Sequence, residues 1–171
     1  MQMVKKVLLS IVIILFSTII FMPKRELYYR LEEQLLSNDI IINNEKIDSS
    51  LFGLTLTNLE LYMKGIKIAD IDRVEIFSLL FYNTISAKGI ESDSSLYKIL
   101  PTKVNSIDAK YIVTNPMSVA MDLNGTFGYA KGFISFSDQK MHFDITEERS
   151  INALRSMLTK GDKGWYYETS F

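Results

Sequence analysis

The stretch that decides the fold is Phe52-Gly53-Leu54-Thr55-Leu56-Thr57-Asn58-Leu59-Glu60-Leu61-Tyr62-Met63. Apolar and polar side chains alternate in it, which is the period of a β-strand with one buried face. The phase changes at Thr57-Asn58: the apolar positions are 54 and 56 before this point, and 59, 61 and 63 after it. If all five side chains face one core, the strand must contain a bulge or bend at this point. The stretch therefore predicts a long, kinked strand.

The same alternation recurs along the rest of the chain. Apolar residues share one face over 107–113, 119–129 and 141–145, and short apolar runs occupy 74–87 and 133–136. Turn signals separate these segments at Asn115-Pro116, Gly132 and Ser137-Asp138-Gln139-Lys140. Because short turns join antiparallel neighbours, the pattern predicts a strongly bent, mainly antiparallel β-sheet.

Two helices are predicted beside this sheet. The first runs from Pro23 to about Leu36, because proline suits a first helical turn and leucines recur at positions 27, 31 and 35. The second begins after Thr146, a capping residue, and ends at Gly161. Apolar residues at 151, 154 and 158 lie on one face of this second helix.

The N-terminus contains an uncharged run from Val7 to Met22, bracketed by Lys5-Lys6 and Lys24-Arg25. This pattern predicts a single transmembrane helix, with the flanking basic side chains reaching the interfaces. A cleaved signal peptide is the alternative, but Phe21-Met22-Pro23-Lys24 offers no small-residue cleavage site. We therefore expect a transmembrane anchor at 1–22 and one β-rich domain at 23–171, a membrane-anchored α+β fold. The basic residues on the two sides of the run are nearly balanced, so charge alone does not set the orientation.

Composition excludes several classes of function. Residues 24–171 carry 17 Lys and Arg against 20 Asp and Glu, and this acidic balance argues against binding nucleic acid or adhering to anionic headgroups. The chain has no cysteine, which excludes disulfides, thiolate nucleophiles and cysteine metal sites.

Three polar or aromatic groups are candidate functional sites. His142 and Asp144 alternate on one strand face as a possible dyad, but a solvated face is favoured, since no serine stands in a nucleophile-elbow pattern. A calcium site at Asp70, Asp72 and Glu75 lacks the EF-hand spacing. Trp165-Tyr166-Tyr167 is interpreted as packing or lining an interface rather than as a stacking platform for a sugar or base.

The glycine-rich segment Gly125-Thr126-Phe127-Gly128 lacks the lysine and spacing of a phosphate loop. The sequence consequently predicts no catalytic residue, no cofactor-binding residue and no metal ligand, and the chain is expected not to be an enzyme.

Two longer patterns resemble a known family. The first is Phe52-Gly53-Leu54-x-Leu56-x-Asn58-Leu59-x-Leu61-x-x-x-Gly65-Ile66-x-Ile68-Ala69, which follows Pro23 and Leu27-x-x-x-Leu31-Glu32-x-x-Leu35. The second comprises Leu123-Asn124-Gly125 and Lys131-Gly132-Phe133-Ile134. Together they resemble the type II secretion system protein N family, which is similar in pattern to AsmA-like envelope proteins.

The resemblance implies a bacterial inner-membrane protein, single-pass, with its body in the periplasm. It implies an accessory role in type II secretion or envelope assembly, with secretion or envelope membrane proteins as partners. The alternative is an AsmA-like module that binds or transfers lipid, with phospholipid acyl chains held on an apolar concave sheet. An open apolar concave face would favour lipid, and a helix lying across that face would favour a closed structural module.

Overall fold

The computed structural model describes residues 2–79, 81–97, 101–162 and 164–171. Two α-helices, α1 (Gln2–Ile20) and α2 (Lys24–Leu36), precede the strands, and two short 3-10 helices, η1 (Ser94–Leu96) and η2 (Ile151–Ala153), interrupt them. The strands are β1 (Ile40–Asn43), β2 (Lys46–Ser49), β3 (Gly53–Met63), β4 (Ile66–Leu79), β5 (Tyr82–Ser92), β6 (Lys103–Ile112), β7 (Ser118–Gly125), β8 (Gly128–Ser135), β9 (Lys140–Glu148), β10 (Thr159–Gly161) and β11 (Gly164–Ser170).

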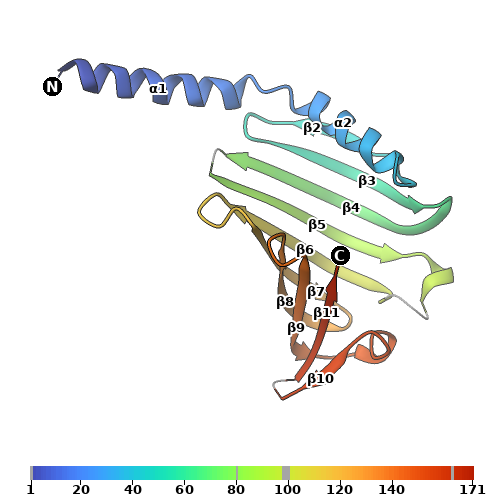
Figure 1. Cartoon of the computed structure of the whole chain (residues 1–171). Helices are drawn as coiled ribbons and strands as arrows, with labels where there is room; N and C mark the ends of the chain where they lie inside the picture. The colour runs from blue at the N-terminus through green and yellow to red at the C-terminus, as the bar shows by residue number, and fades with distance from the viewer. Residues whose placement is uncertain (1, 80, 98–100, 163) are drawn as a thin grey trace.

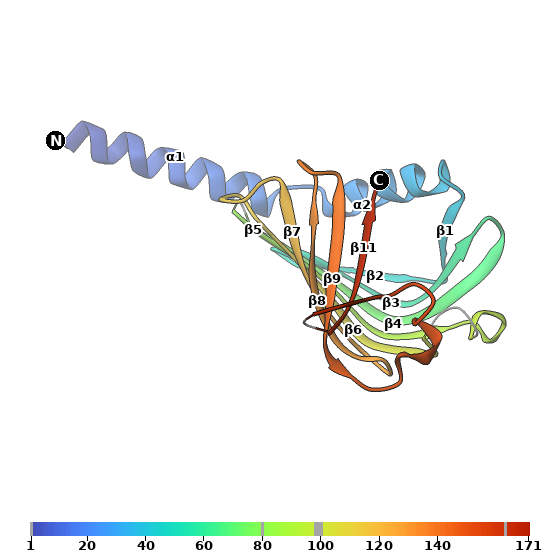
Figure 2. The same cartoon turned by 60° about the horizontal axis from the view of Figure 1, so that its bottom comes forward.

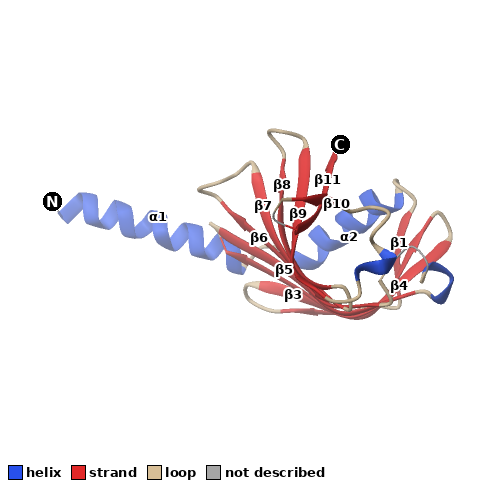
Figure 3. Ribbon diagram, turned by 90° about the horizontal axis from the view of Figure 1, so that it is seen from below, coloured by secondary structure: helices blue, strands red, loops and turns tan. Residues whose placement is uncertain are grey.

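All of these strands belong to one antiparallel sheet, whose order is β1-β3-β4-β5-β6-β7-β8-β9-β11-β10, with β2 also paired to β3 (Figure 1). From β3 to β9 every strand pairs with its successor in the chain, as predicted. The predicted separation at Gly132 is wrong, because Gly132 lies inside β8 and the chain turns between Gly125 and Gly128 instead. The sheet is strongly curved, and α2 lies on its concave side while α1 projects away from it (Figures 2 and 3). The bent, mainly antiparallel sheet and the first amphipathic helix are therefore confirmed.

The prediction of a transmembrane anchor at 1–22 is wrong. Residues 2–20 are helical, but no helix in the described part of the chain is long and apolar enough to cross a membrane. The helix ends at Ile20 and includes Lys5 and Lys6, so its charge-free part, 7–20, is shorter than the ~20 apolar residues that a bilayer requires. The membrane-anchored fold class and the single-pass inner-membrane location predicted from the sequence are therefore wrong.

The predicted second helix is also wrong. Strand β9 continues to Glu148, through the expected helix start, and the segment from there to Gly161, the expected helix end, contains one 3-10 helix, η2, and β10. The amides of Arg149 and Ser150 donate to the carbonyls of Phe127 (3.0 Å) and Thr126 (3.2 Å), so the β7–β8 turn holds the backbone that the first helical turn would need. The apolar face was nevertheless real, because Ile151 is buried.

The leucines of β3 share one face as predicted, but the backbone feature that produces the phase change is not the predicted one. Leu54, Leu56 and Leu59 are all buried in one cluster. The pairing of β3 with β4 continues in the same register on both sides of Asn58, so no residue is inserted there. Asn58 instead takes the left-handed conformation, with φ +58°. The strand is kinked at the predicted position, and the expectation of a bulge at Thr57-Asn58 is wrong.

The kink continues into the neighbouring strands. Gly89 in β5 also has a positive φ, +63°, and a side chain there would meet the carboxylate of Asp72 in β4. In the pairing of β6 with β7 the register shifts between Val104 and Ser106. The irregular positions in β3, β5 and β6 thus lie at one level of the sheet, which gives it a crease in addition to its twist.

One face of the sheet is apolar over most of its width. Cross-strand partners define a core row, consisting of Leu56, Val74, Ala87, Ile107, Leu123, Ala130 and Ile145. Because Leu56 packs in the cluster of Tyr28 from α2, this apolar face is the concave one. The opposite, convex face carries the polar partners Glu75, Ser86, Asp108, Asp122, Lys131 and Asp144.

Candidate functional site

A second row of apolar side chains lies beside the core row and is more open. The members of this groove row are cross-strand partners, one from each strand. They are Leu54, Ile76, Ile85, Ala109, Met121, Gly132, Phe143 and Tyr167. Only Leu54 is buried, Ile85 is 49% exposed, and the other side chains are half-buried. An apolar row that stays partly accessible is a surface available to an apolar ligand.

The groove row leads into a cavity of about 460 Å³ beneath α2. This volume lies in the range of small-molecule sites in proteins, ~300–1,000 Å³. Its walls come from the end of α1, from α2 and from the adjoining ends of β3, β4 and β5. The lining residues are Thr18, Met22, Lys24, Leu27, Tyr28, Leu31, Gly53, Leu54, Ile76, Ser78, Leu79 and Asn83.

Helix α2 covers this end of the sheet through one main anchor. Tyr28 is 4% exposed and packs against Leu54, Leu56 and Leu59, while its hydroxyl donates to Glu45 Oε1 at 3.2 Å. Burial, reinforced by the negative charge of Glu45, raises the pKa of the Tyr28 phenol well above its usual range. The tyrosine therefore stays neutral and holds α2 over the concave face.

The apolar walls of the cavity carry few polar groups. Lys24 is the charged residue among the described residues that line it. Across the cavity floor, Ser78 Oγ donates to Asn83 Oδ1 at 2.6 Å. A mainly apolar cavity with a small number of placed polar groups is the usual composition of a ligand site.

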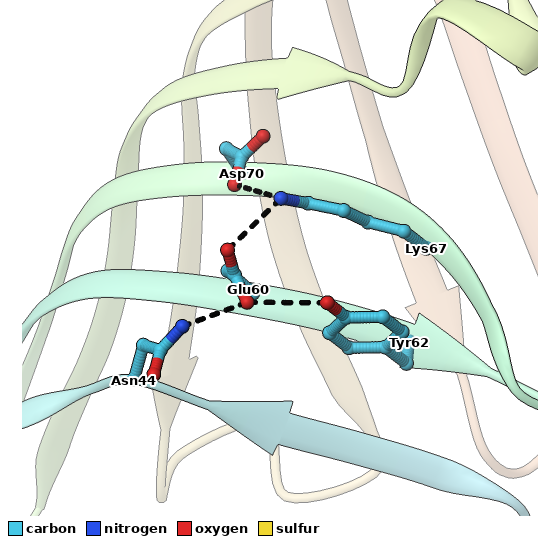
Figure 4. A network of polar contacts seen from close by, with 5 residues as sticks. All are labelled: Asn44, Glu60, Tyr62, Lys67 and Asp70. Atoms are coloured by element: carbon cyan, nitrogen blue, oxygen red, sulfur yellow. Dashed lines mark hydrogen bonds and ion pairs between the residues drawn. The ribbon is translucent and has the colours of Figure 1, made fainter.

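The convex face carries ion pairs instead. Figure 4 shows Glu60 of β3 at the centre of a network, accepting from Lys67 (3.0 Å), Asn44 (2.8 Å) and Tyr62 (3.2 Å). Lys67 also pairs with Asp70 at 2.8 Å. The hydrogen bond from Lys67, with help from Tyr62, lowers the pKa of the Glu60 carboxyl. This face is a solvated, charge-paired surface.

The candidate residues from the sequence lie mostly on this convex face. Asp70 pairs with Lys67, and Glu75 pairs with Arg73 (2.9 Å) and Lys88 (3.2 Å), so two of the three carboxylates of the calcium candidate are engaged by basic side chains. The structure does not bring them together as a ligand set, and the described residues contain no group suited to a metal ion.

His142 lies between aromatic rings on the convex face. Its ring stacks on Tyr166 (5.5 Å between centroids) and lies near Phe133 (5.9 Å). Its Nε2 is 3.2 Å from Asp144 Oδ1, and its Nδ1 is 2.9 Å from Glu168 Oε2. Both ring nitrogens are thus occupied by carboxylates, which is a structural arrangement rather than a base poised beside a nucleophile.

The aromatic and glycine-rich segments have packing roles. Trp165 packs against the cluster of Val104, Phe127 and Ile145, with Arg155 and Lys160 near its ring. In the β7–β8 turn, Phe127 is 4% exposed. The interpretation of Trp165 as a packing residue is confirmed.

Sequence reasoning identified the leucine face but missed the cavity. Its polar residues, Ser78 and Asn83, come from strands whose mutual register no local pattern reveals. Their only signal is negative: they interrupt apolar runs at the β4–β5 turn.

Comparison of the chain with protein-family models, with curated proteins and with solved structures finds no match.

Proposed function

We propose that the chain is a non-enzymatic binding protein whose concave face holds the acyl chain of a lipid. The observation that carries the proposal is the groove row, which runs without a charged residue from the cavity beneath α2 across β4, β5 and β6. Each methylene taken from water into such a groove contributes about 0.8 kcal/mol, so an extended chain has a sufficient driving force. A bent sheet with an apolar concave side is also what the resemblance to AsmA-like proteins implies.

Helix α2 covers only one end of the concave face. Its buried contacts are to β3 and its neighbours, whereas Ile85 in β5 remains 49% exposed. A helix crossing the whole face would have favoured a closed structural module, and the partial cover favours a ligand groove.

Displacement of a fluorescent fatty acid from the purified chain tests this function. The wild type should bind the probe saturably, and Ile85→Glu should weaken binding strongly, because a carboxylate in the groove must be desolvated against the acyl chain. Thr84→Glu is the matched control, since residue 84 lies next in the strand on the convex face opposite Lys110. Absence of saturable binding by the wild type, or equal loss in both variants, would contradict the proposal.

An assembly role through protein contacts is the second candidate. Strand β11 extends to Ser170, but β10 pairs only with its residues 164–166. The outer edge of 167–170 therefore has no neighbouring strand among the described residues, and a partner strand can add there. The Phe171 amide donates to Gln139 on the β9 side, so the amide of the preceding residue, Ser170, faces the open edge. Loss of a co-purifying partner on Ser170→Pro, with acyl binding intact, would separate this role from the first.

A further inference from the structure

We infer that the groove takes a single acyl chain of limited length, and that the ring of Phe143 is the stop that sets this length. The inference rests on the proposed function and specifies the ligand of the same groove. It is supported by the space above Gly132, by the side chains that flank the groove row, and by the number of strands between the cavity and the Phe143 ring.

The groove row contains one position without a side chain, Gly132 in β8. A hollow at this position would carry the groove from Met121 onward to β9. Phe143 of β9 lies directly opposite Gly132, and its ring leans over the glycine, since a Cβ at position 132 would meet Cδ1 and Cγ of that ring (2.7 Å to Cγ). The ring therefore fills the hollow, and a chain that comes along the row from the cavity meets it after Met121.

Side chains on both flanks keep a bound chain on the groove row. On one flank, Ile107 and Leu123 of the core row pack against the buried cluster that Ile151 closes. On the other flank, Tyr111 and Val119 are half-buried cross-strand partners one row nearer the turns. A chain that enters from the cavity is therefore directed along the row toward β8.

The register gives the distance from the cavity to the stop. Before the Phe143 ring, the row crosses β4, β5, β6 and β7 at Ile76, Ile85, Ala109 and Met121. Neighbouring strands lie ~4.8 Å apart, so these three steps span about 14 Å. An extended alkyl chain with C–C bonds of ~1.5 Å advances about 1.25 Å per carbon, so about eleven carbons cover this span. With the head group and the first carbons in the cavity, the best ligand has about fourteen to sixteen carbons.

Competition by saturated fatty acids of increasing length tests the inference on the purified full chain. Acids from decanoate to arachidate, each below its micelle concentration, displace a fluorescent fatty acid, and the concentration for half displacement is measured. For the wild type this concentration should fall roughly tenfold for each two added carbons, because each methylene leaves water. The fall should end at myristate or palmitate, and stearate and arachidate should bind no more tightly.

Two substitutions should move the stop in opposite directions. Phe143→Ala opens the space above Gly132, so affinity should continue to rise through stearate, and arachidate should bind at least about tenfold more tightly than it binds the wild type. Ala109→Phe places a ring in the row two strands earlier, so palmitate should bind no better than decanoate. Phe133→Ala is the matched control, because this ring neighbours Gly132 on the convex face and is 41% exposed, and its length profile should be that of the wild type.

The outcomes separate the inference from the proposed function. A continued rise in the affinity of the wild type to arachidate would overturn the length stop and leave acyl binding intact. The same length profile in Phe143→Ala, Ala109→Phe and the wild type would also overturn it. If no acid displaces the probe, the proposed function itself fails. Melting curves show which variants are folded, and if Phe143→Ala is not, the profile of Ala109→Phe decides.

Discussion

The two ends of the sheet use the same apolar face in different ways. At the C-terminal end, Val104, Phe127, Ala130 and Ile145 form a buried cluster closed by Ile151 from the segment that follows β9. At the N-terminal end, the leucines of β3 pack against Tyr28 of a separate helix. The first end is sealed by side chains of adjoining turns, and the second leaves a cavity of about 460 Å³ beneath the helix. The comparison shows how one continuous face acts as a core at one end and as a binding surface at the other.

The connections explain this difference. In the C-terminal end, the amides of Arg149 and Ser150 are hydrogen-bonded to the β7–β8 turn, so the cover is part of the sheet's own backbone network. Helix α2 is joined to β1 by a short turn and is held mainly by Tyr28 and by a long hydrogen bond from Arg25 to the Ile47 carbonyl (3.4 Å). A cover with few anchors leaves room for a ligand beside it.

The largest expected effect is on the closed end. Phe127→Ala removes a ring that is 4% exposed and should destabilise the fold by about 3–5 kcal/mol. The melting temperature should fall by more than about 6 °C. Phe136→Ala, at a side chain 49% exposed, is the control and should change stability by no more than about 0.5 kcal/mol. A mild effect of Phe127→Ala would show that this end is not the sealed core.

A smaller effect is expected at the crease that joins the two ends. Gly89→Ala combines a positive φ with contact against the Asp72 carboxylate and should cost about 1–3 kcal/mol. Gly65→Ala has a similar φ, +78°, with open space around it, so it should cost less, about 1 kcal/mol. Adding Asp72→Ala to Gly89→Ala should recover part of the difference, as measured by urea unfolding, because it removes the carboxylate and leaves the Cβ of residue 72 at 2.8 Å from the added methyl group. If the two glycine variants are equally stable, the close approach of Gly89 to the Asp72 side chain does not affect the stability of the fold.

The smallest expected effect is the acid dependence of the convex face, where each end carries one perturbed carboxylate. Lys67 lowers the pKa of Glu60, and Lys140, with His142, lowers that of Glu168. A lowered folded-state pKa means that the unfolded chain binds more protons, so stability is present above the unfolded value of about 4.3 and is lost as pH falls through the folded value. Melting temperatures between pH 7 and 3 should fall less steeply for Glu60→Gln and Glu168→Gln than for the wild type. An unchanged slope in both variants would contradict the assignment.

The sheet was predictable because its determinants are local. Alternation in β3, the turn at Asn115-Pro116 and the leucine spacing of 27, 31 and 35 each act within a few residues, and the structure follows them. The segment after β9 shows the limit: residues 151, 154 and 158 had helical spacing, yet tertiary hydrogen bonds from the β7–β8 turn determined its backbone. The phase change at Asn58 was visible as a pattern, but its mechanism, a positive φ with unbroken register, depends on the neighbouring strand.

The candidate site was predictable only in its general character. An apolar concave face follows from alternation, whereas the cavity depends on where α2 lies and on the pairing of Ser78 with Asn83. The transmembrane prediction from the apolar N-terminal run is wrong, because the helix there ends at Ile20 and includes two lysines.

The most direct test of the open concave face uses the absence of cysteine in the chain. Single cysteines at Ile85, in the groove row, and at Thr84, on the convex face, are labelled with the same fluorophore, and a spin-labelled fatty acid is added as a quencher. Residues 84 and 85 are adjacent in β5 but lie on opposite faces. A difference in quenching between them therefore reports the face of the sheet and not the position along the chain. We predict saturable quenching at position 85 and little at position 84. Equal quenching at both positions, or none at position 85, would contradict acyl binding on the concave face.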